Sequence, residues 1–207
     1  MIDPTRRVWR VGHVNDPLGF VPRPLQGWKN RFDDPQRAYR TVYCAAQRET
    51  ALREVLQDFR PDTTMIAEYR SLFGVDPPGG VVPRSWRVAN RLAPARIRAS
   101  APLADADDVV RRQRFERGQA ALLSSYGVEH FDISAVRARQ RPVTQAFGRW
   151  VFDEGAGGVG FRSNIDNEPC AALFEGRCDL RADGPVVELD DAPEFIEVLA
   201  EFTLRLA

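Results

Sequence analysis

The sequence lacks several features that would place it in a common functional class at once. No stretch of the 207 residues approaches the roughly 20 apolar residues that a membrane-spanning helix needs. The N-terminal segment, MIDPTRRVWRVGH, has no apolar core and no small-residue cleavage site, so we expect no secretory signal. The 29 basic and 29 acidic residues cancel, which argues against broad nucleic-acid binding. We therefore expect a cytoplasmic protein that contacts neither membranes nor nucleic acid directly.

Familiar catalytic motifs are also missing. There is no G-x-x-x-x-G-K-[ST] phosphate loop, no H-E-x-x-H metal helix and no G-x-S-x-G nucleophile elbow. The run GAGGVG has the wrong spacing for a dinucleotide-binding loop and follows a predicted helix, so a flexible turn is favoured. These absences exclude the most easily recognised hydrolases and nucleotide-binding proteins.

Cysteine, histidine and lysine are scarce. The three cysteines form no C-x-x-C pair, and Cys44 and Cys170 lie in apolar runs, so we expect reduced thiols and no metal site. His13 and His130 are far apart, which favours surface or packing roles over catalysis. Lys29 is the single lysine, and the other 28 basic residues are arginines. A GC-rich genome is the simplest explanation, although arginine also binds phosphate well through its two-pronged geometry.

Alternating short apolar runs and amphipathic stretches predict an α/β (α+β) protein. We expect a single compact domain over residues 1–207, with a mixed and mostly antiparallel sheet. The predicted strands are 7–11, 40–46, one or two strands in 85–100 broken at Pro94, two strands in 155–176, and 184–190. The predicted helices are 48–60 ending before Pro61, 65–73, 102–128, 142–155, and 191–207 begun by a capping box of Asp191 and Glu194. The last helix is apolar and could pack either within the chain or against a second copy, so a homodimer is a possible assembly.

Residues 41–56, TVYCAAQRETALREVL, predict a buried strand that runs directly into an amphipathic helix. The apolar stripe of this helix comprises Ala51, Leu52, Val55, Leu56 and Phe59. Glu54 lies well away from the centre of that stripe. Helical geometry alone therefore favours an ordinary solvated glutamate.

The segment from Gly27 to Leu56 resembles the N-terminal half of the RES-domain family, which is named for an arginine, a glutamate and a serine. Arg31 and Phe32 match a G-G-R-[FW]-N-like segment, Tyr43 closes the apolar strand, and Glu54 ends an A-L-x-E-like helical core. Later, Ser163 takes the serine position of a Y-x-S strand. The likeness runs in order from about residue 7 to about residue 176 and therefore covers most of the chain.

The resemblance implies a bacterial toxin that consumes NAD as its substrate and needs no cofactor. Its fold would be similar to that of ADP-ribosyltransferase toxins. Members of the family cleave the nicotinamide–ribose bond by hydrolysis or phosphorolysis, or transfer ADP-ribose to a protein. A partner antitoxin with an Xre-type helix-turn-helix domain usually neutralises them.

The resemblance also suggests roles for five side chains. The Glu54 carboxylate would stabilise positive charge on the ribose as the bond breaks. Arg31 would pair with the pyrophosphate and Arg10 would form a second clamp. Tyr43 would stack on nicotinamide or ribose, and Ser163 would donate a hydrogen bond to the amide or the sugar.

Structural alternatives to these roles stay open at this point. Tyr43 could belong to the core, Arg31 could pair with Asp33 or Asp34, and Ser163 could only cap a turn.

Three positions depart from the family pattern. Asn30 stands in place of a glycine, Asp33 in place of an asparagine, and Phe161 in place of the tyrosine of Y-x-S. A negative charge at Asp33 would be unwelcome beside a pyrophosphate. Asp33 and Phe161 motivate one alternative, a catalytically silent domain that binds a nucleotide or a protein. A protein ADP-ribosyltransferase is a further alternative.

Overall fold

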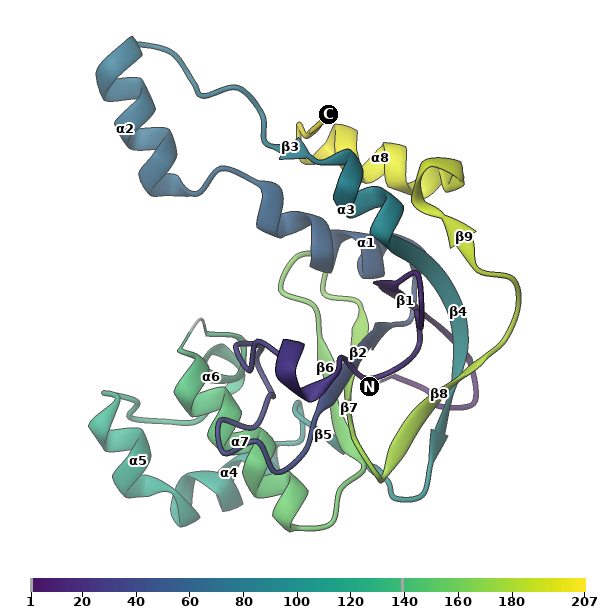
Figure 1. Cartoon of the computed structure of the whole chain (residues 1–207). Helices are drawn as coiled ribbons and strands as arrows, with labels where there is room; N and C mark the ends of the chain where they lie inside the picture. The colour runs from purple at the N-terminus through teal and green to yellow at the C-terminus, as the bar shows by residue number, and fades with distance from the viewer. Residues whose placement is uncertain (1, 139) are drawn as a thin grey trace.

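A curved sheet forms the centre of the molecule, which is a computed structural model describing residues 2–138 and 140–207 (Figure 1). Eight strands run in the order β5 (Leu103–Asp105), β6 (Gly158–Arg162), β7 (Pro169–Phe174), β2 (Thr41–Ala45), β1 (Arg7–His13), β4 (Asn90–Ala99) and β8 (Cys178–Ala182), with β9 (Val187–Glu188) also paired to β4. Only the β5–β6 pair of this sheet is parallel. The predicted mixed, mostly antiparallel sheet is confirmed.

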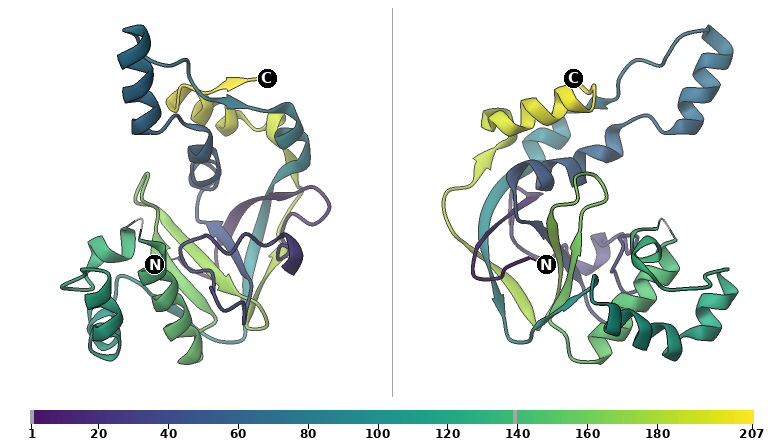
Figure 2. Two further views of the ribbon diagram at one scale, coloured as in Figure 1. Left: turned by 60° about the vertical axis from the view of Figure 1, so that its left-hand side comes forward. Right: turned by 180° about the vertical axis from the view of Figure 1, so that it is seen from behind.

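The helices gather in two groups that leave a gap between them in the ribbon (Figures 1 and 2). One group comprises α1 (Arg48–Leu56), α3 (Arg84–Ala89) and α8 (Pro193–Glu201), together with the short 3₁₀ turns η2 (Gln57–Phe59) and η3 (Leu189–Asp191). The other comprises α4 (Val109–Gly118), α5 (Ala120–Ser125), α6 (Ile133–Arg137) and α7 (Arg141–Asp153). A further 3₁₀ turn, η1 (Arg23–Leu25), lies in the long loop after β1.

The sheet buries a different core on each face, because successive strand residues point to opposite sides. On the helix-covered face, Phe32, Phe115, Phe147 and Leu52 are fully buried in one large cluster. The opposite face buries a smaller cluster of Val8, Val42, Cys44, Ala95, Ala171 and Leu173, against which Leu18 and Phe20 of the loop after β1 pack. The two groups of helices therefore share one face of the sheet.

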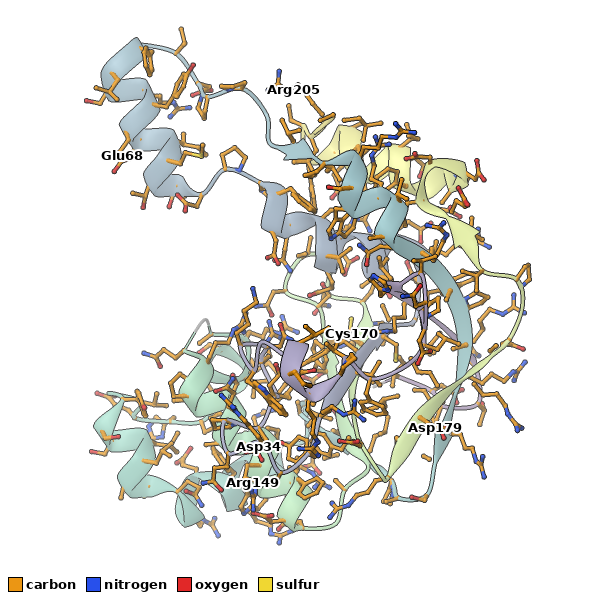
Figure 3. The ribbon with its side chains drawn as sticks, in the orientation of Figure 1. Asp34, Glu68, Arg149, Cys170, Asp179 and Arg205 are labelled. Carbon is orange, nitrogen blue, oxygen red and sulfur yellow. The ribbon has the colours of Figure 1, made fainter. Side chains whose placement is uncertain are left out.

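One helix stands apart from both groups. The helix α2 (Thr63–Phe73) projects from the body, and none of its residues is buried (Figures 1 and 2). Glu68, labelled in Figure 3, lies on this arm. A short parallel pair, β3 (Val81–Val82) with β10 (Arg205–Leu206), ties the returning chain to the C-terminus. The helix predicted over 65–73 is confirmed.

The strand break predicted at Pro94 is wrong, because β4 runs through that residue without interruption. Pro94 accepts a hydrogen bond from the N–H of Asp183 through its carbonyl oxygen at 3.1 Å. The N–H that proline lacks would point to the same side, where β4 is paired with β8 from Ala95 onward and with β9 at Arg91 and Leu92. Pro94 lies in the gap between these partners, so the missing donor costs no ladder bond.

Several further predictions need correction. The strand region predicted over 85–100 begins with the helix α3, and the helix predicted over 191–207 ends at Glu201. Residues 103–105 form the edge strand β5 rather than part of a helix, and β8 was not predicted. The expected capping box at Asp191 is absent, because α8 begins after Ala192 with no side-chain cap. The carboxylate of Glu194 pairs instead with Arg48 at 2.8 Å. A long-range ion pair has replaced the local hydrogen bond that the sequence pattern suggested.

The predictions for scarce residues fit the structure where it describes them. Cys44, Cys170 and Cys178 are buried free thiols. His13 is exposed, and His130 is exposed beside Glu116. In residues 2–138 and 140–207, no helix is long and apolar enough to cross a membrane.

Candidate active site

A cavity of about 740 Å³ opens between the sheet and α1 on the helix-covered face. This volume lies within the range of small-molecule and cofactor sites. Its wall combines charged, amide and aromatic side chains from both halves of the sequence. Glu54, Arg31, Tyr43 and Arg10, four of the five predicted site residues, belong to the lining, whereas Ser163 does not.

The floor of the cavity is a row of residues across four neighbouring strands. Phe161 of β6 is in register with Cys170 of β7, Cys170 with Ala45 of β2, and Ala45 with Trp9 of β1. All four line the cavity, and Cys170 of this row is labelled in Figure 3. With strands about 4.8 Å apart, three steps span roughly 14 Å. The floor is therefore long enough for an extended ligand.

Glu54 lies on the face of α1 that covers this floor. The helix presents Ala51, Glu54 and Val55 to the cavity, at the spacing of a single helical face, and Asp58 of the following turn η2 continues this side. Glu54 is half-buried, and its Oε2 accepts only a long hydrogen bond of 3.4 Å from Gln57. Helical geometry alone favoured full exposure, but Glu54 is half-buried because a second face of α1, outside its apolar stripe, borders the cavity.

Arg31 approaches from the loop between β1 and β2. It is 9% exposed, and its guanidinium carbon lies 5.3 Å from the centre of the Phe161 ring. Burial lowers the pKa of Arg31, and the nearby Glu54 carboxylate partly offsets this effect. Among the described residues, Arg31 forms no ion pair and its Nη1 has no hydrogen-bond partner. The expected alternative, pairing with Asp33 or Asp34, does not occur.

Asp33 and Asp34 are occupied elsewhere. Asp34 is completely buried and pairs with Arg149 at 3.3 Å, as their neighbouring labels in Figure 3 indicate. Asp33 is also completely buried and accepts hydrogen bonds from the N–H of Asn30, from the Thr41 hydroxyl and from the Tyr43 hydroxyl. Asp33 does not line the cavity, so its carboxylate would not lie in direct contact with an anion bound there.

Tyr43 contributes its ring to the wall and its hydroxyl to the structure behind it. The hydroxyl donates to Asp33 at 3.3 Å and accepts from the N–H of Phe32 at 3.0 Å. Burial raises the pKa of Tyr43 well above its usual value, and the Asp33 carboxylate raises it further. The hydroxyl therefore stays protonated and anchors the loop that carries Arg31.

Arg10 is part of the lining, but its guanidinium is engaged on the other side of β1. Its neighbours in the strand, Trp9 and Val11, line the cavity, so the side chain of Arg10 points to the opposite face. There its Nε and Nη1 donate to the carbonyl oxygens of Pro17 and Tyr43 at 3.0 and 3.1 Å. Burial lowers the pKa of Arg10 to about 10. In this structure Arg10 fastens a loop and offers no free group to the cavity.

Ser163 is 1% exposed and lies just beyond the end of β6. Its Oγ accepts a hydrogen bond from the N–H of Ile165 at 3.1 Å, and its main chain bonds to Glu168 and Asn167. The turn it supports carries Asn164 and Ile165, which do line the cavity. The structure thus brings Arg31, Tyr43 and Glu54 together and keeps the Ser163 hydroxyl behind them.

Several lining residues were not anticipated from the sequence. Trp86 and Phe59 both line the cavity, and their rings meet edge to face with centroids 5.1 Å apart. Arg141, the first residue of α7, lines the cavity from the other group of helices. Its only sequence signal was Pro142, which marks a helix start, and nothing distinguished it from the other arginines. Asn30 and Phe161, two of the departures from the family pattern, also lie in the wall.

The arrangement offers one half-buried carboxylate beside a buried guanidinium, with flat aromatic side chains along the floor. Such a site suits a ligand that has both anionic and planar parts and that develops positive charge during reaction. In the part of the chain that the structure describes, no three His, Cys, Asp or Glu side chains are grouped to hold a metal ion.

Comparisons with known proteins bear on the identity of this domain. The sequence model of the RES domain matches residues 7–195, which include every wall residue named above. No curated protein matches the chain. A solved structure, that of the M. tuberculosis MbcT–MbcA toxin–antitoxin complex, shares 12% sequence identity and a TM-score of 0.49 over 94% of this chain and 89% of that chain.

Proposed function

This chain belongs to the RES domain family, and from that premise we propose that it is an NAD-consuming enzyme that acts as the toxin of a toxin–antitoxin pair. The reaction is cleavage of the bond between nicotinamide and ribose. The observation that carries the proposal is that Glu54 and Arg31 line one cavity, where the Glu54 carboxylate raises the pKa of Arg31, and that neither forms an ion pair with a described residue. A bound ligand can therefore use both groups.

The chemistry of the bond fits the wall of the cavity. When the C1′–N1 bond breaks, its electron pair moves to the positively charged pyridinium nitrogen, and nicotinamide leaves as a neutral molecule. Positive charge then develops on the ribose, as in other glycosidic cleavages. The Glu54 carboxylate, fixed on α1, stabilises that charge most strongly in the transition state. Water or orthophosphate completes the reaction at C1′, and the proton released by water goes to solvent.

The remaining wall residues take binding roles in this proposal. Arg31 pairs with the pyrophosphate through its free guanidinium nitrogen. The ring of Tyr43 and the aromatic side chains of the floor provide flat surfaces for nicotinamide and adenine. An Xre-type antitoxin would silence the enzyme by covering the cavity or holding the chain inactive.

The test follows free nicotinamide after purified protein is mixed with NAD, with and without orthophosphate. We expect release by the unaltered chain and a loss of about a hundredfold or more in Glu54→Gln, which keeps the shape and removes the charge. Glu49→Gln, on the same helix but outside the cavity wall, is the matched control. Release by the unaltered chain that is no faster than by Glu54→Gln would refute the proposal.

The dependence on orthophosphate identifies the acceptor. Phosphorolysis requires orthophosphate and yields a phosphorylated ADP-ribose, whereas hydrolysis proceeds without it. Transfer to a protein would instead label a discrete band when tagged NAD is added to a cell lysate.

Because the Ser163 hydroxyl is buried behind the cavity wall, one alternative function is a catalytically inactive domain that binds a nucleotide or a protein. Calorimetry separates this alternative from the enzyme, because NAD would then bind without releasing nicotinamide.

A further inference from the structure

We propose that Arg31 and Arg141 together form a binding site for a phosphate group, with Arg141 supplying the second half of the clamp. The inference deepens the proposed function, because NAD would place its pyrophosphate there. Binding can nevertheless be measured without any turnover.

The first observation is a lack of partners that sets these two arginines apart. Several arginines have one buried nitrogen without a hydrogen-bond partner among the described residues. In four of them another nitrogen bonds or pairs with a carboxylate or an amide oxygen: Arg40, Arg87, Arg111 and Arg137. The guanidinium groups of Arg31 and Arg141 show no such bond within the described part of the chain, and in each the unpartnered atom is Nη1.

An unpartnered cationic donor in a protein interior is costly unless a ligand completes it. Arg31 is 9% exposed, so solvent does little to satisfy its guanidinium. Both arginines line the same cavity. The cavity therefore contains hydrogen-bond donors that the folded chain itself leaves unused.

The second observation is that the two cations border one cavity and repel each other across it. After burial and the opposing effect of Glu54, the charge of Arg141 is the next influence on Arg31, whose pKa it lowers. Two neighbouring guanidinium groups repel each other, and no carboxylate of the described residues forms an ion pair with either. An anion that bridges them reduces this repulsion, because its negative charge lies beside both cations at once.

The third observation is the direction from which Arg141 enters the cavity. It is the first residue of α7, a helix of 13 residues whose N-cap, Gln140, makes no side-chain capping bond. The N-terminal end of a helix carries partial positive charge and favours anions. Asn30 and Asn164 add neutral polar groups to the same wall. Arg31 and Arg141 thus reach the ligand from two separate elements, the loop before β2 and the start of α7.

A phosphate group suits this pair better than a carboxylate. A tetrahedral phosphate has enough oxygen atoms to accept from two planar guanidinium groups at once, and its charge balances more than one cation. A single carboxylate can contact two arginines, as Glu154 does with Arg111 and Arg114, but its one negative charge would balance only one of the two cations. The chemical class is therefore orthophosphate or the phosphate of a nucleotide.

The experiment uses ADP as the probe, because ADP carries a pyrophosphate but no nicotinamide. Calorimetry on the full chain compares the unaltered protein with Arg141→Gln, Arg141→Lys and the exposed control Arg117→Gln, which removes the same charge away from the cavity. We expect Arg141→Gln to weaken ADP binding by about tenfold or more. Arg141→Lys keeps the charge but not the two-pronged geometry and should weaken binding by a smaller factor. Arg117→Gln should bind as the unaltered chain does.

Equal ADP affinity in the unaltered chain and Arg141→Gln would overturn the inference, as would no binding of ADP or orthophosphate to the unaltered chain. If Arg141→Gln does not fold, as judged by its circular dichroism and melting, Arg141→Lys decides by the same comparison. ADP binding that depends on Arg141, without nicotinamide release from NAD, would support this site and contradict the enzyme. Nicotinamide release together with an ADP affinity that does not depend on Arg141 would support the enzyme and contradict this phosphate site.

A further arm of the experiment identifies the source of the phosphate. Orthophosphate is titrated alone and in the presence of saturating ADP. Competition assigns the arginine pair to the phosphate of the nucleotide. Orthophosphate binding that persists with ADP, and that Arg141→Gln weakens, assigns the pair to free phosphate.

Discussion

The main-chain N–H of Phe32 donates to the phenolic oxygen of Tyr43 at 3.0 Å, and this bond joins the loop that carries Arg31 to the middle of the sheet. The Tyr43 hydroxyl donates a hydrogen bond to Asp33, and the Asp33 carboxylate also accepts one from the N–H of Asn30. The hydroxyl of Tyr43 and the carboxylate of Asp33 thus organise residues 30–33 of the loop. The position of the Arg31 guanidinium depends on groups that never touch a ligand.

Tyr43→Phe tests this dependence, because it keeps the ring and removes only the hydroxyl. The N–H of Phe32 loses its partner, so we expect the free energy of unfolding to fall by about 1–3 kcal/mol. NAD binding should weaken as well, since the loop holds Arg31 less firmly. Urea denaturation and calorimetry measure the two effects, with the exposed Tyr126→Phe as control. Wild-type stability in Tyr43→Phe would show that the bond contributes nothing.

Ser163→Ala distinguishes a turn residue from a ligand contact. If its role is the bond from the Ile165 N–H to Oγ, the variant loses about 0.5–1.5 kcal/mol of stability. A hydroxyl that bonded only to substrate would leave stability unchanged and weaken binding. Chemical denaturation measures the stability of Ser163→Ala, and NAD titration measures its binding. Weaker NAD binding with unchanged stability would contradict the role in the turn.

Asp166 should make the stability of the protein depend on acidity. Burial tends to raise its pKa, but hydrogen bonds from Thr50, the Glu168 N–H and Arg53 outweigh this effect, so the pKa lies below its ordinary value of 3.8. A carboxylate with a lowered pKa stabilises the fold above its unfolded pKa and loses that contribution as the pH falls through its folded pKa.

We therefore expect stability to decline below about pH 4, with a shallower decline in Asp166→Asn. At pH 7 the same variant should be less stable by about 1–3 kcal/mol, because Thr50 and Arg53 lose a charged partner. Melting temperatures recorded from pH 7 to pH 2.5 provide the measurement, and the exposed Glu197→Gln provides the control. Parallel curves for the unaltered chain and Asp166→Asn would contradict the assignment.

The three cysteines should resist alkylation in the folded protein. Burial raises the pKa of Cys44 to about 12 and that of Cys178 to about 11, and it also raises the pKa of Cys170. The reactive thiolate is therefore rare at pH 8, and the side chains are shielded as well. Mass spectrometry after iodoacetamide treatment should find unmodified native protein and three modifications after denaturation. Rapid alkylation of the native protein would contradict this prediction, because it would show that the buried thiols become accessible.

The sequence predicted those elements whose local pattern agrees with their tertiary surroundings. The apolar run before Tyr43 became β2, and Pro142 and Gly155 bracket α7 as expected. Where a distant partner decided the outcome, local reasoning failed. Pro94 passes through a strand because β8 and β9 leave a gap opposite it, and Glu194 bonds to Arg48 rather than to its own helix end.

The candidate site was predictable in part for the same reason. Glu54 could be named only through the family resemblance, since its helix alone points it towards solvent. Its half-burial arises where α1 borders the cavity, a tertiary arrangement that no local pattern records. Arg141 could not be named at all, because its significance depends on Arg31, more than a hundred residues earlier, having no partner.

The cavity floor also constrains when the protein can become active during its synthesis. Trp9 and Ala45 leave the ribosome early, but Phe161 and Cys170, which complete the row, are made only after most of the chain. At about 5–20 residues per second, more than a hundred residues separate the two halves by several seconds or longer. A nascent chain therefore holds its first half of the floor without the second, and any activity must wait until β7 is inserted beside β2.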